Sequence, residues 1–450
     1  MHEKLFLYIT LLFSFQYLTT NSKSLFEISF GAKNSPPESI ETFFESNFNN
    51  QATVYFDVGS NKQKLPFYIN LNSPITYIAG KNSTLKEGEP KFDEEKSNSF
   101  YKNTSENNSY STFTICGTPS KDQIYLNDYM SIMLNFYLAI LKYSDNPLDY
   151  SCVLGLGYEE PMYEPRSVET FLTQIKQNNL IDKKIFLIEY KNSNEGKIIF
   201  GDYPHSLMPD KYKQENFVEM ENVNVDDTEV IWSAKIYSYY GDKILYDYLS
   251  TVDFELNLGF IIGSQLYETE LNDSFFQEKI DNGECFTREI NMTYNVYRGY
   301  YCKSNTDISK MRSLSLFIDK IKYKIEFLNS DLFMDYKGYK MFLVIFNSDD
   351  DYYYKTNFIL GKPFFRKYPM VYNMDNIVEK IGFYNNIISV KEEEEKDWNY
   401  FNLIFVGIGV IIIGLLIYII IKYFGKPKKK KANELIDDFE YSPKQITIPV

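Results

Sequence analysis

Two short segments of the 450-residue chain repeat a pattern that could carry chemistry. Residues 69–72 read Ile-Asn-Leu-Asn, and residues 254–257 read Phe-Glu-Leu-Asn. Each segment follows a β-rich run and precedes another apolar run, so the repeat predicts two similar lobes that bring Asn70 and Glu255 to a shared midline. A carboxylate at such a midline can act as a general acid or base, whereas an amide can only orient a group by hydrogen bonding.

Other kinds of catalytic site have little support. The chain contains two histidines, and His2 would leave with an N-terminal leader, so a Ser-His-Asp triad could use only His205, in what reads as a surface turn. Four cysteines committed to disulfides leave no ligand set for zinc. The acidic pairs and runs at 226–227 and 349–351 could bind calcium weakly, but solvated turns of this kind are much more common. The sequence therefore predicts no metal and no cofactor.

The composition favours strands over helical bundles. The chain has 40 tyrosines and 36 phenylalanines, and from Gln51 onward short apolar runs are broken by Gly, Asn, Asp and Pro. One helix is predicted over Ser167–Asn178, where apolar residues recur at helical spacing and Ser167 can cap the first turn. The net charge of −14 argues against nucleic-acid binding.

The two ends of the chain carry targeting signals. The apolar run Leu5–Leu18 predicts a signal peptide over residues 1–22. The run Leu403–Ile421 has 19 residues without a charge, enough to cross a bilayer core of roughly 30 Å, and a lysine cluster follows it. We expect a single-pass type I membrane protein of the secretory pathway with an extracellular or luminal body. Its charged stalk would cover 391–400, its transmembrane helix 401–424 and its cytoplasmic tail 425–450.

An exported body should carry disulfides and glycans. Four cysteines predict two disulfides with three possible pairings, and the nearest-neighbour scheme joins Cys116 to Cys152 and Cys285 to Cys302. Glycosylation sequons occur at Asn82, Asn103, Asn107, Asn272 and Asn291.

From about Ala52 to Ile388, the order and spacing of several motifs resemble the pepsin-like aspartic protease family. Asn70 lies 11 residues after Gly59, where that family places its first catalytic Asp, and Glu255 lies eight residues before Gly263, which matches the end of the second motif. The other matching segments are 55–59 with Gln63, 151–158, 196–201, 232–236, and 358–361 with 364–368.

The resemblance implies an all-β, bilobal fold with pseudo-two-fold symmetry and a central cleft. It divides the chain into an acidic lead-in at 23–50, an N-terminal lobe at 51–210 and a C-terminal lobe at 211–390. The inhibitory segments of the family are basic, so an acidic lead-in fits a cleft that needs no such segment.

The chain departs from the family at both catalytic Asp-Thr-Gly motifs. In the family, two facing carboxylates share one proton and activate a water. Asn70 cannot serve as a base, and the extra methylene of Glu255 displaces its carboxylate by more than about 1 Å. Leu71 and Leu256 replace the threonines, so we expect apolar packing between the lobes in place of a polar cross-brace. Asparagine replaces the glycine in both copies.

The resemblance also identifies a flap that would close over the cleft. The matching residues are Cys116, Gly117 and Thr118, without the family's tyrosine, and Tyr77 is a further candidate for the cleft. A bridge from Cys116 to Cys152 would tether this flap to the cleft floor, or would be purely structural. The other predicted bridge matches the family's second-lobe disulfide.

Three functions remain open from the sequence. The first is a membrane-anchored pseudoprotease that binds a peptide or protein, with Asn70 and Glu255 on the cleft floor. The second is an active aspartic endopeptidase with an altered dyad, in which Glu255 acts as base and Asn70 donates a hydrogen bond. The third is an adhesion or sorting protein that uses the outer surface of the fold. None of the three requires a cofactor or a nucleic acid.

Overall fold

The structure is a computed structural model that describes residues 26–384 with short gaps. The predicted signal peptide, stalk, transmembrane helix and tail lie outside the described residues, as do Asn107, Ser167 and the acidic runs at 226–227 and 349–351. No helix within the described residues is long and apolar enough to span a membrane. The gaps fall at 33–36, 49–50, 85–87, 104–109, 112–114, 143–150, 159–167, 193, 224–230, 246–249, 293–294, 319–322, 349–354 and 377.

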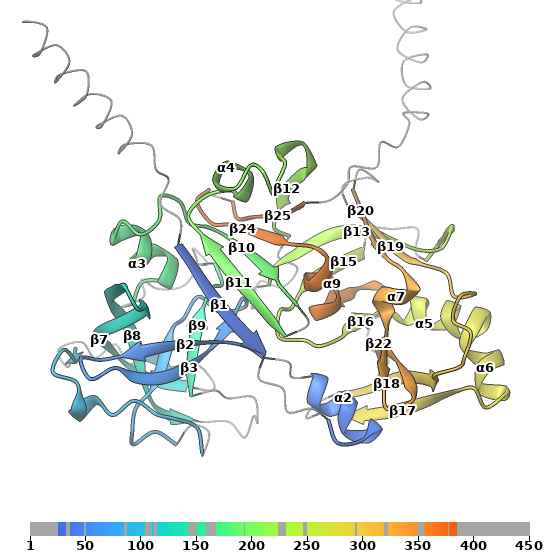
Figure 1. The fold of residues 1–450 in the computed structure, drawn as a ribbon, viewed down its shortest axis with the longest axis horizontal. Coiled ribbons are helices and arrows are strands. Elements are labelled where there is room, and N and C mark those ends of the chain that lie inside the picture. Colours follow the sequence, from blue (N-terminus) through green and yellow to red (C-terminus); the bar gives the residue numbers. More distant parts are fainter. Residues whose placement is uncertain are drawn as a thin grey trace, which may run out of the picture. The chain divides into compact units, whose positions relative to one another are not determined.

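The larger of two sheets has 14 strands, which come from the beginning, middle and end of the described chain (Figure 1). In spatial order they are β12 (Phe217–Glu221), β25 (Lys380–Tyr384), β24 (Met370–Asn373), β10 (Ile185–Tyr190), β11 (Glu195–Phe200), β1 (Phe26–Ala32), β2 (Ala52–Val58), β3 (Gln63–Asn70), β9 (Cys152–Gly155), β4 (Tyr77–Ala79), β8 (Met130–Lys142), β7 (Ile115–Asn127) and β5 (Tyr101–Lys102), with β6 (Tyr110–Ser111) paired to β7.

The second sheet has 11 strands, all from the second half of the chain. Their spatial order is β17 (Cys285–Asn291), β18 (Val296–Lys303), β22 (Tyr339–Asn347), β16 (Ile261–Gly263), β23 (Phe358–Leu360), β15 (Ser250–Phe254), β13 (Ser233–Tyr240), β19 (Leu314–Ile318) and β20 (Tyr323–Phe327), with β14 (Lys243–Ile244) paired to β13 and β21 (Phe333–Tyr336) to β22. The mostly β architecture confirms the β-rich part of the predicted fold class and is consistent with a pepsin-like fold.

Helices are short and connect or cover the strands. The predicted helix at Ser167–Asn178 begins later, as α3 (Phe171–Gln177), because the Thr170 hydroxyl accepts from the Thr173 N–H and caps the first turn. The other helices are α2 (Ile40–Phe48), α4 (Pro204–Leu207), α5 (Gln265–Leu271), α6 (Gln277–Asp281), α7 (Asn329–Leu332) and α9 (Lys362–Lys367), with single turns η1 (Glu94–Lys96), η2 (Gln214–Asn216) and the π-helical η3 (Asn272–Phe276).

One four-strand arrangement occurs once in each sheet. In the first sheet the order is β3-β9-β4-β8, and in the second it is β15-β23-β16-β22. In both, the first strand runs parallel to the second, the second antiparallel to the third, and the third parallel to the fourth. The repeated segments at 69–72 and 254–257 begin in the last residues of the first strand of each arrangement, β3 and β15. The topology therefore gives the two segments equivalent positions.

The fold begins earlier than the sequence analysis placed it. Strand β1 pairs with β11 from Phe26 to Gly31 and joins β2 at its end, so part of the acidic lead-in belongs to the first sheet. Helix α2 packs Phe43 and Phe44, both buried, against apolar residues of the second sheet. Glu27, Glu38 and Glu45 are exposed beside buried aromatic residues, which is why composition alone suggested a separate leader.

One of the two predicted disulfides is present. Cys285 and Cys302 face each other in the β17–β18 ladder and are bonded. Cys152, by contrast, is a buried free thiol, so the predicted bridge to Cys116 is wrong. Strands β4 and β8 lie between β9 and β7, and three strand spacings amount to about 14 Å along the sheet. A disulfide requires Cα atoms within about 7 Å.

Candidate functional site

The structure brings Asn70 and Glu255 to the ends of equivalent strands. β3 ends at Asn70, whose carbonyl accepts from the Leu156 N–H at 2.8 Å. β15 ends at Phe254, and the N–H of the following Glu255 donates to the Leu360 carbonyl at 3.0 Å. Each position is therefore fixed by the parallel neighbour strand of its own lobe.

Near each of these positions, a glycine lets two backbone segments of the same lobe pack in close contact. A Cβ atom on Gly155 would lie 2.5 Å from the backbone of Ile75, and one on Gly361 would lie 2.2 Å from the carbonyl oxygens of Leu258 and Phe260. Real side chains do not tolerate such approaches, so the tight packing of each loop against its neighbour strand depends on glycine.

The two turns use the same hydrogen bond. The Asn72 N–H donates to Asn70 Oδ1 at 2.8 Å, and the Asn257 N–H donates to Glu255 Oε1 at 3.0 Å. In each case a side chain accepts from the backbone two residues further on, as in an Asx turn. The local geometry thus survives the replacement of glycine by asparagine in both copies.

A direct hydrogen bond joins the two segments. Asn72 Nδ2 donates to Glu255 Oε2 at 2.6 Å. Because Asn257 occupies the other carboxylate oxygen, both oxygens of Glu255 already accept a hydrogen bond from the protein. The Glu255 carboxylate is therefore held in place by the turn of the opposite segment.

The expected loss of the polar cross-brace is a further correction. Leu71 and Leu256 are indeed buried, at 1% and 0% exposure. Yet Asn257 Nδ2 donates to the Ile69 carbonyl at 2.7 Å, and Asn257 Oδ1 accepts from the Ala52 N–H at 3.0 Å. The brace has moved from the second to the third residue of the motif, because an asparagine side chain reaches across where a leucine side chain packs.

The Trp232 indole ring holds the first segment in place by a hydrogen bond to its backbone. Trp232 is fully buried, and its Nε1–H donates to the Leu71 carbonyl at 3.0 Å. The ring lies edge-on between Tyr158 and Tyr372, with centroids 5.0 and 4.9 Å away. This stack links the first segment to β24 of the 14-stranded sheet.

Replacing Trp232 by phenylalanine should lower the free energy of unfolding by about 2–3 kcal/mol, since it orphans a buried carbonyl and leaves a void. Chemical denaturation monitored by circular dichroism would measure the change. Tyr372→Phe is the matched control, because Tyr372 packs on the same indole and its hydroxyl has no hydrogen-bond partner among the described residues. An equal loss in the two variants would contradict a specific role for the indole N–H.

Glu255 is half-buried. Burial raises the pKa of this carboxyl above its usual range, while the hydrogen bonds from the Asn257 N–H and the Asn72 amide lower it. Among the described residues, no second carboxyl contributes to the pKa shift of Glu255, so the structure shows no acid that shares its proton.

Asn70 is half-buried, and its amide oxygen closes the turn of its own segment. Its Oδ1 must accept from the Asn72 N–H, so its Nδ2 points away from the turn with two donors. Within the part of the chain that the structure describes, these donors have no protein acceptor. Asn72 itself is exposed, so the site can be reached by solvent.

The residues expected in the flap lie in a hairpin strand. Cys116 and Gly117 pair with Ser111 and Tyr110 of β6, and Thr118 follows on β7. Tyr77 is 8% exposed and packs in a cluster with Tyr68, Tyr137 and Val153.

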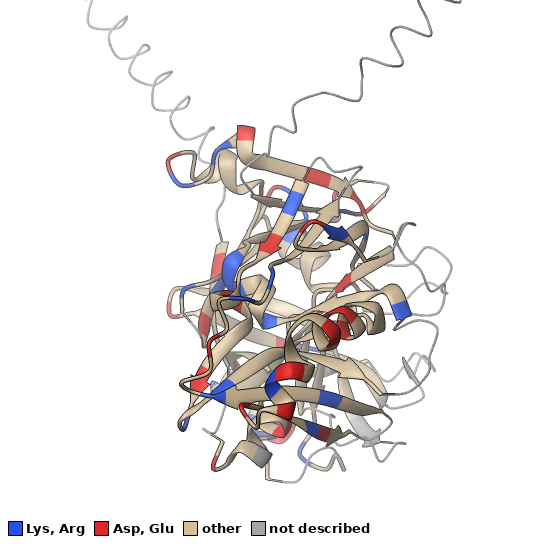
Figure 2. Cartoon of the chain, turned by 90° about the vertical axis from the view of Figure 1, so that its right-hand side faces the viewer, with Lys and Arg blue, Asp and Glu red and all other residues tan. Residues whose placement is uncertain are grey.

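The remaining predicted residues are dispersed. Among the sequons, Asn82 and Asn291 are exposed, whereas Asn103 and Asn272 are partly buried. Acidic and basic residues are interspersed along the described strands and helices (Figure 2). No group of three or more potential metal ligands occurs within the described ranges.

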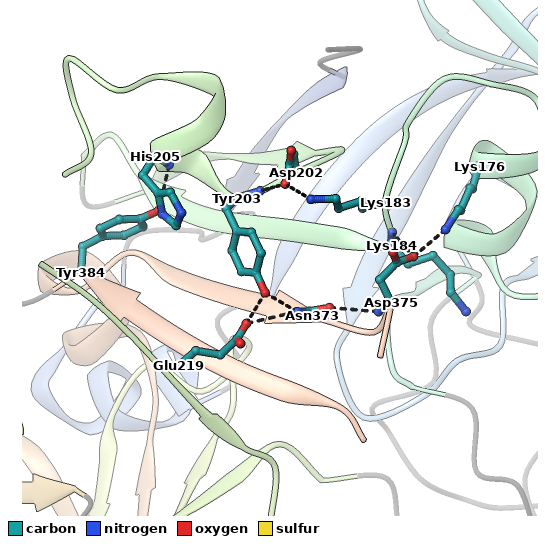
Figure 3. Close-up of polar contacts among 10 residues, drawn as sticks. All are labelled: Lys176, Lys183, Lys184, Asp202, Tyr203, His205, Glu219, Asn373, Asp375 and Tyr384. Carbon is teal, nitrogen blue, oxygen red and sulfur yellow. Dashed lines mark hydrogen bonds and ion pairs between the residues drawn. The ribbon is translucent and has the colours of Figure 1, made fainter. Parts of the chain in front are cut away.

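His205 belongs to an aromatic cluster with Tyr203, Phe217 and Tyr384. It lies on the short helix α4, and its Nδ1 is 2.9 Å from the Tyr384 hydroxyl (Figure 3). Its ring stacks on Tyr203 at 5.3 Å, and the Tyr203 hydroxyl donates to Glu219 at 2.5 Å. These contacts fasten β12 and β25 to the loop that contains α4.

The comparisons agree with this geometry. Residues 52–248 match the family model described as eukaryotic aspartyl protease. That range includes Asn70 and ends shortly before Glu255, so the second segment is assigned by its equivalent topology. No curated protein matches the chain. Over residues 52–248, the chain is similar to the eukaryotic aspartyl proteases, which supports the predicted pepsin-like family assignment.

Proposed function

We propose that this chain is a type I membrane-anchored pseudoprotease that binds a peptide or protein without cleaving it. The observation that carries the proposal is the 2.6 Å hydrogen bond from Asn72 Nδ2 to Glu255 Oε2. The carboxylate of Glu255, which would have to activate water, accepts a hydrogen bond from Asn72 of the other segment. The position of its partner acid is occupied by the amide of Asn70. Peptide hydrolysis in this architecture requires one acid to accept a proton and a second to donate one.

The side chains of Asn70 and Asn72 support peptide binding more than peptide hydrolysis. Asn70 Nδ2 offers neutral donors that suit a peptide carbonyl, and they remain donors at any pH between 3 and 7. We place the ligand in the cleft that the family fold implies, on the face that carries Asn70, Asn72 and Glu255. The body would lie outside the cell or in the lumen of the secretory pathway, tethered by the helix at 401–424.

A cleavage assay tests the loss of activity. The full-length chain, purified in detergent, should cleave no member of a peptide library between pH 3 and pH 7. Glu255→Gln keeps the shape and removes the acid, so it should change peptide binding by no more than about threefold. Cleavage that disappears in Glu255→Gln would instead establish an active endopeptidase with an altered dyad.

A second variant tests the position of the binding face. Asn72→Arg retains a donor for Glu255 but fills the floor with a longer side chain, so peptide affinity should fall at least about tenfold. Asn82→Arg, on an exposed turn, is the matched control and should leave affinity unchanged. Binding that survives Asn72→Arg would favour the outer surface of the fold and an adhesion or sorting role.

A further inference from the structure

The two oxygens of the Glu255 carboxylate have different neighbours. Oε1 accepts a hydrogen bond from the Asn257 N–H, within its own turn, at 3.0 Å. Oε2 accepts from Asn72 Nδ2, which belongs to the other segment, at 2.6 Å. Oε2 is therefore the oxygen that faces the first segment.

The place beside Oε2 is the one that a shared water would need. A water that contacts both residue 70 and residue 255 must lie between the two segments, and it must bind the carboxylate oxygen on that side. At 2.6 Å, Asn72 Nδ2 makes a direct hydrogen bond, and no molecule fits between the two atoms. The Asn72 carboxamide thus lies where that water would bind.

The backbone of the first segment holds Asn72 at this position. The Asn72 N–H donates to Asn70 Oδ1 at 2.8 Å. The preceding residue, Leu71, is 1% exposed, and its carbonyl accepts from Trp232 Nε1–H at 3.0 Å. Because these contacts fix the backbone, the Asn72 side chain is preorganised to reach across to Glu255.

The second asparagine of the repeat has a different role. If the two copies were used alike, the Asn257 side chain would bond to the side chain of Asn70. Instead, Asn257 Nδ2 donates to the Ile69 carbonyl at 2.7 Å, and its Oδ1 accepts from the Ala52 N–H at 3.0 Å. The Asn257 side chain therefore braces backbone groups, whereas the Asn72 side chain caps the acid. The contact at Oε2 is specific to Asn72.

We propose that Asn72 excludes water and ligand hydroxyl groups from Glu255 Oε2. This inference rests on the proposed binding function and narrows its ligand: a peptide with planar amide groups, and not one that presents a hydroxyl to the acid. The missing second acid and the occupied oxygen are then two separate obstacles to hydrolysis. Asn70→Asp would remove only the first of them.

Two matched peptides test the exclusion. In one, a –CH(OH)–CH2– unit replaces a single peptide bond, and in the other a –CH2–CH2– unit does. The full-length chain, purified in detergent at pH 7, should bind the two with affinities that agree within about twofold, because Oε2 is not open to the hydroxyl. Asn72→Gly removes the carboxamide and should bind the hydroxyl peptide at least about tenfold more tightly than its partner, since a hydrogen bond to a charged group forms.

The control and the contrary outcomes are as follows. Asn82→Gly, on an exposed turn, should show no preference between the two peptides. Equal affinities in Asn72→Gly would overturn the inference, and so would a tenfold preference for the hydroxyl peptide in the unchanged chain. Failure of every protein to bind either peptide would instead contradict the proposed binding function, and the inference is then decided by a measurement without ligand.

That measurement is chemical modification of the Glu255 carboxyl. The full-length chain is treated with a water-soluble carbodiimide and glycinamide at pH 6, and the modified peptides are quantified by mass spectrometry relative to Glu45, which is exposed. Asn72→Gly should raise the relative rate at Glu255 about tenfold, because it frees an oxygen from a charge-assisted hydrogen bond. Asn82→Gly should leave the rate unchanged. An unchanged rate in Asn72→Gly would show that Oε2 is already accessible and would overturn the inference.

Discussion

Replacing Phe43 and Phe44 together by alanine is expected to lower the free energy of unfolding by at least about 5 kcal/mol, since each buried Phe→Ala change typically costs 3–5 kcal/mol. The two side chains are 0% and 1% exposed. Both pack on Phe260, with ring centroids 6.3 and 5.7 Å apart, and Phe43 also contacts Tyr336 at 5.0 Å. A Cβ on Gly299 would meet the Phe44 ring at 2.6 Å, so this helix sits directly on the sheet.

Urea denaturation of the full-length chain would measure the loss. Glu45→Ala is the matched control on the same helix, because Glu45 is exposed and its removal should change stability by less than about 0.5 kcal/mol. A loss below about 2 kcal/mol in the double variant would mean that α2 is a detachable leader. The expected loss would establish it as part of the core.

This helix illustrates where the sequence was insufficient. The segment before Gln51 contains several glutamates, and its overall charge suggested a leader outside the fold. The adjacent pair Phe43 and Phe44 was the available signal, because two neighbouring aromatics in a polar segment need a surface to bury them. Which surface receives them depends on the second sheet, and local pattern holds no information about that contact.

The equivalent positions of Asn70 and Glu255 could be predicted because the two residues lie in the repeated segments 69–72 and 254–257. The same order of strands around each position produces the same turn, and the 17-residue separation of Cys285 and Cys302 suits a hairpin ladder. The prediction of a bridge from Cys116 to Cys152 was wrong because closeness in sequence does not reveal that strands β4 and β8 lie between the two cysteines in the sheet.

The cross-brace shows a second limit of sequence reasoning. The motif indicated which residues had changed, and Leu71 and Leu256 are buried as their apolar character requires. The roles of Asn72 and Asn257 depend on side-chain direction across the two segments, which only the assembled fold defines. The presence of asparagine at the same place in both copies was the signal that could have suggested a shared function.

Replacing Lys362 by methionine is expected to stabilise the protein by up to about 5 kcal/mol below pH 7 in buffers free of small anions. Burial and the Arg366 charge lower the pKa of Lys362 from 10.5 to about 7. Each unit of difference between the unfolded and folded pKa corresponds to 1.36 kcal/mol. Methionine fills a similar volume and carries no charge, so it removes this penalty with little change in packing.

The sign of the pH dependence follows from proton binding. Between pH 7 and about 10.5, the unfolded chain binds the Lys362 proton more strongly than the folded chain does, so the stability of the wild type rises with pH in that window. The advantage of Lys362→Met should therefore be largest below pH 7 and should fade as the pH approaches 10.5. Urea denaturation at pH 6, 8 and 9.5 in gluconate buffer measures it, with Lys367→Met as the exposed control. A constant difference across these pH values would show that Lys362 titrates normally, with a solvated ammonium or an unrecognised acidic partner.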